Sequence, residues 1–371
     1  MLNFKRYSKF VFPSLVLFGL FGCGSPTATD QQATEELQTE TEVVDLPLVV
    51  ATTDVICDLT RQIAQETIDL NCLVDAGIDP HVYQATPDDR RAIDQADLIL
   101  YGGYAFEPSL INLVNATDNP APKIAVYEEA VTNPIMTADG HHHHHHGDDH
   151  DHGHSHDHDH DHDHDHDHGH SHDHNHDHGH SHGDDEEFPD PHVWHDVNNG
   201  MAIVNVISEQ LAQLQPDQAQ LYQDQASAIN DELGAIDEWI KAQIDTIPAD
   251  QRILVSNHDA LGYFVEAYGL ESNTALQGVS TEEAPTAGRV GELVRKLQDS
   301  NVPTIFVESS VNPTLINTVA NEANVQVADN PLFADGLGEE GSGAETYQQK
   351  LMLNTQTIVE GLGGSFSPFQ G

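Results

Sequence analysis

Residues 48–74 read LVVATTDVICDLTRQIAQETIDLNCLV, and this stretch indicates the class of fold. Residues 48–52 are a short apolar run of the kind found in buried strands, and residues 70–74 predict a second strand. The residues between them, 54–65, predict a helix. A strand, a helix and a second strand in succession are typical of a parallel sheet covered by helices, so the segment predicts an α/β fold.

The same alternation continues in both halves of the chain. A helix is predicted at residues 87–95, and further strands at residues 98–101, 123–127, 253–256, 304–307 and 325–328. Helical stretches separate the later strands as well, so the sequence predicts two open α/β lobes. We place the N-terminal lobe at residues 47–200 and the C-terminal lobe at residues 248–371.

A long segment without strand signals, residues 201–247, lies between the predicted lobes. It is broken once, at Pro216, and proline suits the first turn of a new helix. Beyond that point, apolar residues recur at steps of three and four, among them Leu221, Ile229, Leu233, Ile236 and Ile240. We therefore predict one rigid connecting helix over residues 216–247, about 45 Å long at about 1.5 Å per residue.

The first residues have the features of an export signal. Three basic residues precede an apolar run at residues 10–22, which leads into Cys23 through Leu-Phe-Gly. This ending resembles a bacterial lipobox, and the resemblance implies cleavage before Cys23 and attachment of a lipid to it. An uncleaved membrane helix is the alternative, but about 13 apolar residues are fewer than the roughly 20 that span a bilayer. We assign residues 1–22 to a signal peptide and the polar residues 23–46 to a flexible tether, which predicts an extracytoplasmic or periplasmic protein.

The chain is strongly acidic, with 62 acidic and 13 basic residues and a formal net charge of −49 at pH 7. Such a charge disfavours nucleic acid and anionic membrane surfaces as partners, because like charges repel one another. Contact with a membrane is therefore expected only through the lipid on Cys23. The same charge favours a cationic ligand.

A low-complexity insert at residues 139–187 holds 23 of the 27 histidines. It contains six consecutive histidines, at residues 141–146, and continues with Asp-His and Gly-His-Ser-His units up to His182. An expression tag would explain the first six histidines, but not the irregular run that follows them in mid-chain. Because the insert has almost no apolar residues, we expect it to stay disordered and to offer many weak, exchangeable metal sites.

Four histidines lie outside the insert: His81, His192, His195 and His258. A lone histidine is more often a hydrogen-bonded structural residue than a metal ligand. However, His81, His192 and His258 fall at or near strand ends, where open α/β sheets place their ligand sites. Three imidazoles at about 2.0–2.1 Å from the ion are a common zinc ligand set with a fourth position to be filled. These three residues are the first candidates for a central metal site.

Four motifs resemble signature segments of one family. They are DPHVYQATPDD at residues 79–89, DPHVWHD at 190–196, SNHDALGYFVEAYGL at 256–270 and FADGLG at 333–338. Together they resemble the zinc and manganese solute-binding proteins of ABC importers, and the resemblance covers most of the chain. It implies two α/β lobes joined by one long rigid helix, with a metal site in the cleft between them. It also implies a membrane permease and its ATPase as partners.

The resemblance assigns roles to particular residues. His81 and His192 match the ligands from the N-terminal lobe, and His258 matches the first ligand from the C-terminal lobe. Asp335 matches a family position occupied by a carboxylate ligand. Manganese-selective relatives have a glutamate at the position of His258, and a third imidazole favours Zn²⁺ over Mn²⁺. We therefore expect one tightly bound Zn²⁺.

Two departures from the family pattern leave alternatives open. Zinc-binding members with a His-rich loop often carry an acidic residue just before the first histidine, where this chain has Pro80. The fourth ligand is then either Asp335 or a water molecule. His195 stands where an apolar residue is usual, and it is either a further ligand, a neighbour of the site or a residue on the access route.

Cys57 and Cys72 also have two interpretations. Cys57 lies in the first turn of a predicted helix and Cys72 near the end of the next strand, elements that pack on each other in an α/β unit. In an oxidising compartment they form either a disulfide or two buried free thiols. Metal binding by this pair is disfavoured, because the two residues lack a CxxC spacing.

Two other functions share some of these features. A zinc hydrolase also uses three protein ligands and an open position, but it needs a general base, and no HExxH or comparable motif is present. We therefore do not expect an enzyme. A metal buffer or adhesin that works without a transporter would have the same lipoprotein architecture, because a fold does not fix a function.

Overall fold

The computed structural model describes residues 46–137, 187–272, 275–282 and 284–371. The predicted signal peptide, Cys23, nearly all of the tether and the His-rich insert lie outside the described residues. Within the part that is described, none of the helices combines the length and the apolar character needed to cross a bilayer.

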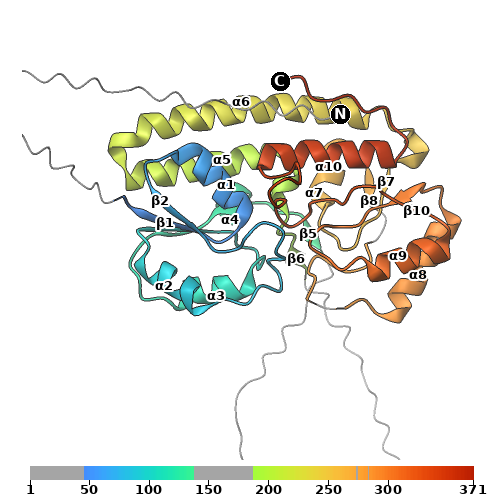
Figure 1. Ribbon diagram of the computed structural model, residues 1–371, viewed down its shortest axis with the longest axis horizontal. Coiled ribbons are helices and arrows are strands. Elements are labelled where there is room, and N and C mark those ends of the chain that lie inside the picture. The colour runs from blue at the N-terminus through green and yellow to red at the C-terminus, as the bar shows by residue number, and fades with distance from the viewer. Residues whose placement is uncertain (1–45, 138–186, 273–274, 283) are drawn as a thin grey trace, which may run out of the picture. The chain divides into compact units, whose positions relative to one another are not determined.

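A parallel sheet with the strand order β2-β1-β3-β4 forms the centre of the N-terminal lobe (Figure 1). Its strands are β1 (Leu48–Ala51), β2 (Asp69–Cys72), β3 (Leu98–Tyr101) and β4 (Lys123–Ala125). The predicted strand over residues 123–127 is two residues too long. Its last two residues belong to α4 (Val126–Ala130), because the chain turns at the sheet edge, where Tyr127 N donates to Gly102 O at 3.0 Å.

Besides α4, the helices of this lobe include α1 (Asp54–Ala64), α2 (Pro87–Gln95) and α3 (Pro108–Ala116). The sequence marks where two of them begin. The hydroxyl of Thr53 accepts from Ile56 N at the start of α1, and Thr86 and Asp89 form a reciprocal capping box at the start of α2. Both caps direct the chain from a strand or loop into a helix, so α/β alternation follows from local sequence.

The C-terminal lobe repeats this order with shorter strands. β7 (Ile253–Leu254) pairs with β8 (Glu271–Ser272), and β9 (Thr304–Ile305) pairs with β10 (Gln326–Val327), all in parallel. A backbone hydrogen bond from Phe306 N to Val255 O, 2.9 Å long, places the two pairs side by side. β7 and β9 are therefore neighbours, as β1 and β3 are in the N-terminal sheet, although the two pairs form separate two-stranded sheets. The helices of this lobe are α7 (Gly262–Tyr268), α8 (Ala287–Asp299) and α9 (Thr314–Ala323).

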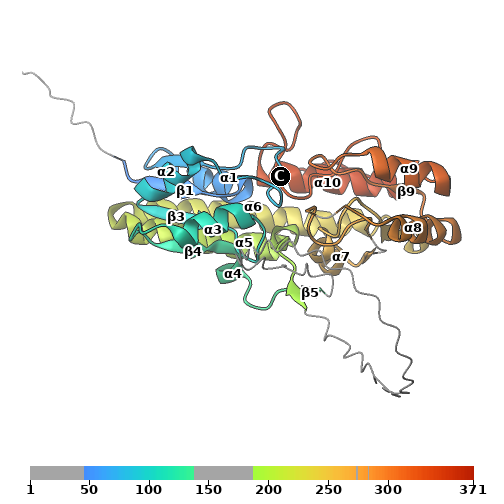
Figure 2. The ribbon, with the colours of Figure 1, turned by 90° about the horizontal axis from the view of Figure 1, so that it is seen from below.

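Three long helices pack together along one side of both lobes (Figure 1). They are α5 (Val197–Leu214), α6 (Ala219–Ile244) and α10 (Tyr347–Gly361). α6 contacts α1 and α5, and it also contacts α7 and α10, so it joins the lobes. The helix is shorter than the predicted 216–247 at both ends. Pro216 begins a separate 3₁₀ turn, η2 (Pro216–Gln218), and the helix ends at Ile244, with Asp245 as its C-cap. Figure 2 shows β1 and β3 near one end of α6 and α8 and α9 near the other.

Four short elements complete the described part of the chain. β5 (Met136–Thr137) and β6 (Phe188–Pro189), which flank the His-rich insert, pair antiparallel and were not predicted. The 3₁₀ turn η1 (Val193–His195) leads into α5, and η3 (Ala249–Gln251) precedes β7. The pairing of β5 with β6 brings together the segments that precede and follow the insert.

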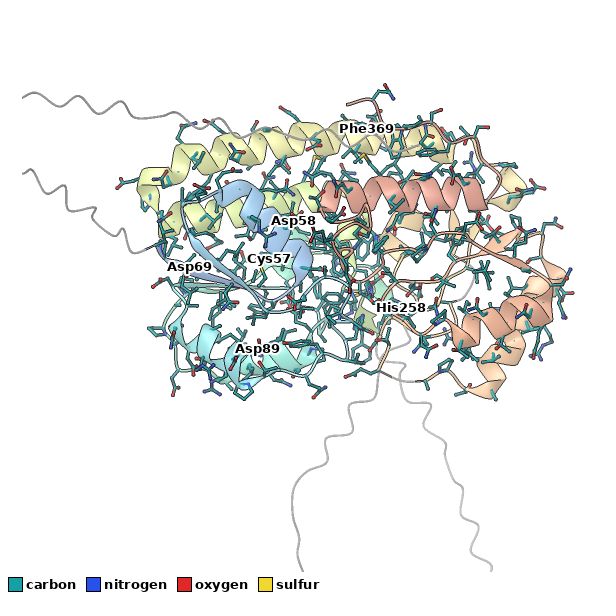
Figure 3. All side chains as sticks on the ribbon, in the orientation of Figure 1. Cys57, Asp58, Asp69, Asp89, His258 and Phe369 are labelled. Carbon is teal, nitrogen blue, oxygen red and sulfur yellow. A yellow bond between two sulfur atoms is a disulfide. The ribbon has the colours of Figure 1, made fainter. Side chains whose placement is uncertain are left out.

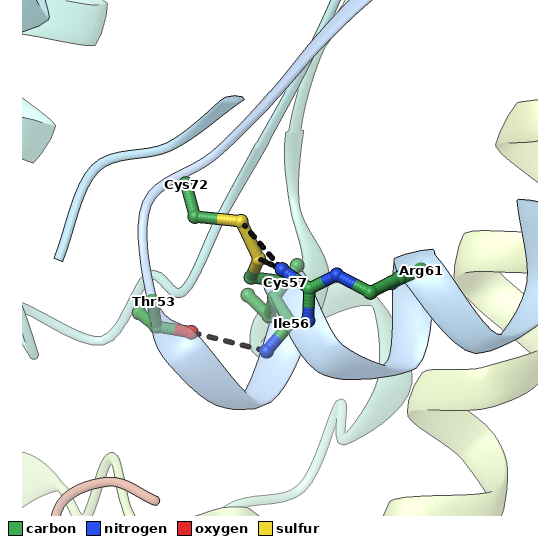
Figure 4. The surroundings of a disulfide bond; sticks show 5 residues. All are labelled: Thr53, Ile56, Cys57, Arg61 and Cys72. Atoms are coloured by element: carbon green, nitrogen blue, oxygen red, sulfur yellow. Dashed lines mark hydrogen bonds between the residues drawn. A yellow bond between two sulfur atoms is a disulfide. The ribbon is translucent and has the colours of Figure 1, made fainter. Parts of the chain in front are cut away.

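Cys57 and Cys72 are joined by a disulfide between α1 and β2 (Figure 4). Their Cα atoms lie 5.7 Å apart, within the usual range for a disulfide. Arg61 donates to both sulfur atoms, at 3.1 Å to Cys57 Sγ and 3.4 Å to Cys72 Sγ. Of the two alternatives that the sequence left open, the structure therefore contains the bonded pair.

Candidate metal centre

Four loops at the carboxyl ends of strands or just before η1 bring four side chains together. His81 follows β2, His192 immediately precedes η1, His258 follows β7 and Asp335 follows β10. His258 lies between the two lobes (Figure 3). Open parallel sheets bind ligands at this edge, because the loops that leave it converge there. All four side chains are buried.

The ligand atoms of this cluster lie close to one another. His192 Nε2 is 3.3 Å from His81 Nε2, 3.4 Å from His258 Nε2 and 3.2 Å from Asp335 Oδ1. Asp335 Oδ1 is 3.0 Å from His258 Nε2 and 3.7 Å from His81 Nε2, and all four atoms fit within 4.8 Å. A tetrahedral ion about 2.0–2.1 Å from each ligand requires ligand atoms about 3.3–3.4 Å apart. The cluster therefore has the size of a tetrahedral metal site.

Two carboxylates orient two of the imidazoles. Asp190 Oδ1 accepts from Nδ1 of His192 at 2.8 Å, and Glu308 accepts from both Nδ1 and the backbone N of His258. A hydrogen bond from Nδ1 selects the tautomer whose Nε2 carries the free lone pair, which is the form that binds a metal. Ser310 Oγ donates to Asp335 Oδ2 at 3.1 Å, so the other carboxylate oxygen, Oδ1, faces the cluster.

These orienting residues were not identified from the sequence. Asp190 was within reach of a sequence argument, because it lies two residues before His192 in the same motif. Glu308 and Ser310 had no local signal, because they lie 50 residues or more from His258 along the chain and reach the site only through the fold.

The charges in the cluster shift its pKa values strongly. Burial opposes charge on His258, but the carboxylates of Asp335 and Glu308 outweigh burial and hold the pKa of His258 well above its usual value. Burial also lowers the pKa of His192, but Asp190 and Asp335 raise it by more than burial lowers it, so the net shift is upward. Burial would raise the pKa of Asp335, yet the surrounding imidazoles keep it well below its usual value. A metal ion at this place would replace protons.

Aromatic rings shield the cluster from water on the N-terminal side. The ring of Phe106 meets His81 edge-on at a centroid distance of 5.0 Å and His192 at 5.6 Å. Phe106 and Trp194 are themselves completely buried. Exclusion of water lowers the local dielectric constant and strengthens interactions between an ion and its ligands.

A cavity of about 320 Å³ reaches the cluster at His81. Its lining includes Tyr104 and Glu128 from the N-terminal lobe, Phe188 from β6, and Glu282 from the C-terminal lobe. The cavity therefore extends from His81 to β6, and it carries acidic groups that attract cations.

His195 lies beside the cluster but is not part of it. Its side chain is buried, and Nε2 donates to Ala334 O at 3.0 Å. Burial lowers the pKa of His195 well below its usual value, and the nearby Lys350 and His192 lower it further. His195 is therefore a neutral hydrogen-bond donor to the residue just before Asp335.

Comparisons with known sequences connect the chain to metal-binding proteins of bacteria. The manganese-binding lipoprotein MntA of Halalkalibacterium halodurans is 28% identical to it over 92% of this chain and 93% of the relative. The manganese ABC transporter substrate-binding lipoprotein PsaA of Streptococcus pneumoniae is 30% identical over 85% of this chain and 88% of the relative. The zinc-binding protein TroA of Treponema pallidum is 29% identical over 85% of this chain and 89% of the relative.

The fold is also similar to that of a solved metal-binding protein. The solved structure of periplasmic zinc-binding protein TroA from Treponema pallidum aligns with a TM-score of 0.70 and 28% sequence identity, over 85% of this chain and 99% of that one. A family model matches residues 49–361, nearly all of the described part of the chain. The chain therefore belongs to the family described as zinc-uptake complex component A, periplasmic (ZnuA).

Proposed function

We propose that this protein is the extracytoplasmic Zn²⁺-binding component of an ABC-type zinc importer, with four metal ligands: His81, His192, His258 and Asp335. The observation that carries the proposal is the spacing of these four buried ligand atoms, between 3.0 and 3.7 Å for the pairs described above. Three imidazoles and one carboxylate at tetrahedral spacing suit Zn²⁺. The position of Asp335 Oδ1 supports this carboxylate, rather than water, as the fourth ligand.

Manganese is the second candidate, because the relatives MntA and PsaA are named for it. The donor set favours zinc over manganese. Carboxylate, carbonyl and water ligands suit Mn²⁺, whereas imidazole suits Zn²⁺, and for any given site Zn²⁺ generally binds more tightly than Mn²⁺. His258, which is held by Glu308 and directed into the cluster, supplies the third imidazole.

The other parts of the chain serve delivery of the ion. We infer that Cys23 carries the lipid that anchors the mature protein to a membrane, and the relatives MntA and PsaA are named lipoproteins. Two lobes, at residues 47–200 and 248–371, flank the helical segment 201–247 and present the closed site to a membrane permease and its ATPase. This arrangement binds the ion without chemical change, so the protein is not an enzyme.

We infer that the His-rich insert at residues 139–187 gathers zinc near the site. Its flanking strands β5 and β6 pair with each other, and Phe188 of β6 lines the cavity that reaches His81. Ions that dissociate from weak sites tethered at this place are present at high effective concentration at the cavity. The insert then supplies the tight site without competing with it.

Metal analysis of protein purified without added metal, followed by competition between Zn²⁺ and Mn²⁺, tests the function. We expect one tight equivalent of zinc that a large excess of Mn²⁺ does not displace. The variant His258→Glu recreates the mixed donor set of manganese-selective relatives, and its preference should move toward Mn²⁺. Retention of manganese by the parent would support the second candidate. Normal zinc-limited growth after deletion of the gene would favour a metal buffer or adhesin over an importer.

A further inference from the structure

The carbonyl oxygen of Ala334, the residue before Asp335, accepts three hydrogen bonds from other elements. The donors are Lys350 Nζ of α10 at 2.9 Å, His195 Nε2 of η1 at 3.0 Å and Trp194 Nε1 of η1 at 3.2 Å. A carbonyl oxygen has two lone pairs, so three donors saturate it. The peptide group that joins Ala334 to Asp335 is therefore fixed in orientation.

The backbone on both sides of this peptide is held in the same manner. Asn354 of α10 donates to Phe333 O at 2.8 Å and accepts from Phe333 N at 2.9 Å. Asp54 of α1 accepts from Leu337 N at 2.6 Å. A Cβ atom at Gly336 would lie 2.4 Å from Asp54 Oδ2, so only glycine lets this carboxylate approach. Residues 333–337 are thus held by side chains from α1, α10 and η1 rather than by a strand.

Lys350 is an unusual residue for this position. It is completely buried, and its ammonium group lies 5.1 Å from the centre of the Trp194 ring. Burial lowers the pKa of Lys350 to about 7, against the opposing charges of Asp54 and Asp335. Burying an amine costs free energy that an apolar side chain at the same place would avoid. Its hydrogen bond to Ala334 O is its specific contribution to this region.

We propose that His195 and Lys350 are positioning residues, which hold Asp335 in place for metal binding through the carbonyl oxygen of Ala334. The inference rests on the ligand role proposed above for Asp335. His195 follows His192 by three residues, so the shared carbonyl also ties the segment of an N-terminal ligand to that of a C-terminal one. Metal binding by the two lobes is then coupled through one peptide group.

A double-mutant cycle in the full chain tests this role. Zinc affinity is measured by competition with a chelator for the parent, His195→Leu, Asp335→Ala and the double variant. We expect His195→Leu to weaken the tight site about 10- to 100-fold, as is usual for residues that orient metal ligands. In the Asp335→Ala background, His195→Leu should lower zinc affinity by less than about threefold, because no carboxylate remains to be positioned. Lys350→Met, tested in both backgrounds, provides a second cycle should His195→Leu not fold.

Two further variants separate positioning from general stability. His195→Gln keeps a side-chain N–H donor and should recover most of the lost affinity. Thr355→Val removes a buried hydroxyl of α10 that donates within its own helix, to Leu351 O, and should leave zinc affinity unchanged. Equal losses in both backgrounds, or no loss in either, would overturn the proposal. A parent protein without a tight zinc equivalent would instead contradict the proposed function.

Discussion

The two lobes support their proposed metal ligands by different means. In the N-terminal lobe, a four-stranded sheet and the Cys57–Cys72 disulfide fix the end of β2, and the chain reaches His81 nine residues later. In the part of the C-terminal lobe that the structure describes, each strand has two residues, and individual side chains hold the ligand loops, as Glu308 does for His258. We infer that regular backbone structure sets the position of His81, whereas buried polar contacts orient His192, His258 and Asp335.

Loss of an imidazole from either lobe should have the largest effect. His258→Ala and His81→Ala each remove one of the four proposed ligands, so both should weaken tight zinc binding by more than about 100-fold, beyond the usual effect of losing an orienting residue. Chelator competition measures the tight site, and calorimetry measures the weaker sites of the insert, which should remain. If His258→Ala still binds one zinc as tightly as the parent, the assignment of the site is wrong.

Removal of the disulfide should affect stability and leave metal binding intact. The double variant Cys57→Ala/Cys72→Ala opens a loop with a sequence separation of 15 residues, which corresponds to about 3 kcal/mol in the free energy of unfolding. Denaturant unfolding of the metal-free protein measures this loss. Zinc stoichiometry should stay at one tight equivalent. Two thiols that alkylate freely in native, unreduced parent protein would show that the pair is not bonded.

Removal of an orienting carboxylate from the C-terminal lobe should have the opposite effect: it should weaken zinc binding rather than the stability of the fold. Glu308→Leu leaves Nδ1 of His258 without its acceptor, and we expect zinc affinity to fall about 10- to 100-fold. Asp190→Leu makes the matched change at His192 in the other lobe. Equal zinc affinities of Glu308→Leu and the parent would show that backbone structure alone orients His258.

The pH dependence of the site follows from the raised pKa values of His258 and His192. Protons compete with zinc for these imidazoles. As the pH is lowered, zinc affinity should therefore begin to fall at a pH higher than the usual imidazole pKa of about 6.5, and it should fall further with more acid. The metal-free protein should respond in the opposite direction. Protonated His258 stabilises the fold below the unfolded-state pKa, and this contribution is lost as pH rises through the raised folded-state pKa. Zinc affinity and the thermal stability of the metal-free protein, each measured as a function of pH, check the two directions. If both quantities changed in the same direction with pH, the assignment of His258 as a ligand with a raised pKa would be contradicted.

Deletion of residues 139–187 should have the smallest effect on the tight site. The described lobes contain all four proposed ligands, so one tight zinc and the fold should remain, while several weaker equivalents disappear. We expect growth to suffer only when zinc is scarce. Calorimetry that found the tight site lost would show that the insert supplies a ligand.

The sequence by itself determined the α/β class, two lobes and a long helix between them. Local patterns were enough for the bounds of α2 (Pro87–Gln95) and β3 (Leu98–Tyr101), because capping residues and apolar runs act within a few positions. The predicted strands placed His81, His192 and His258 at or near strand ends, and the resemblance added Asp335; the structure has His192 just before η1. These four residues are the cluster that the structure brings together.

Only the tertiary structure decided how that cluster is held. The partnership of Glu308 with His258, the bonds to Ala334 O and the role of His195 all join residues that are distant in the sequence. The short strands of the C-terminal lobe were predicted too long for a related reason: apolar runs report burial, whereas strand length depends on where a neighbouring strand is available for pairing. Contacts between distant segments leave no local pattern, because their geometry exists only after the lobes have packed.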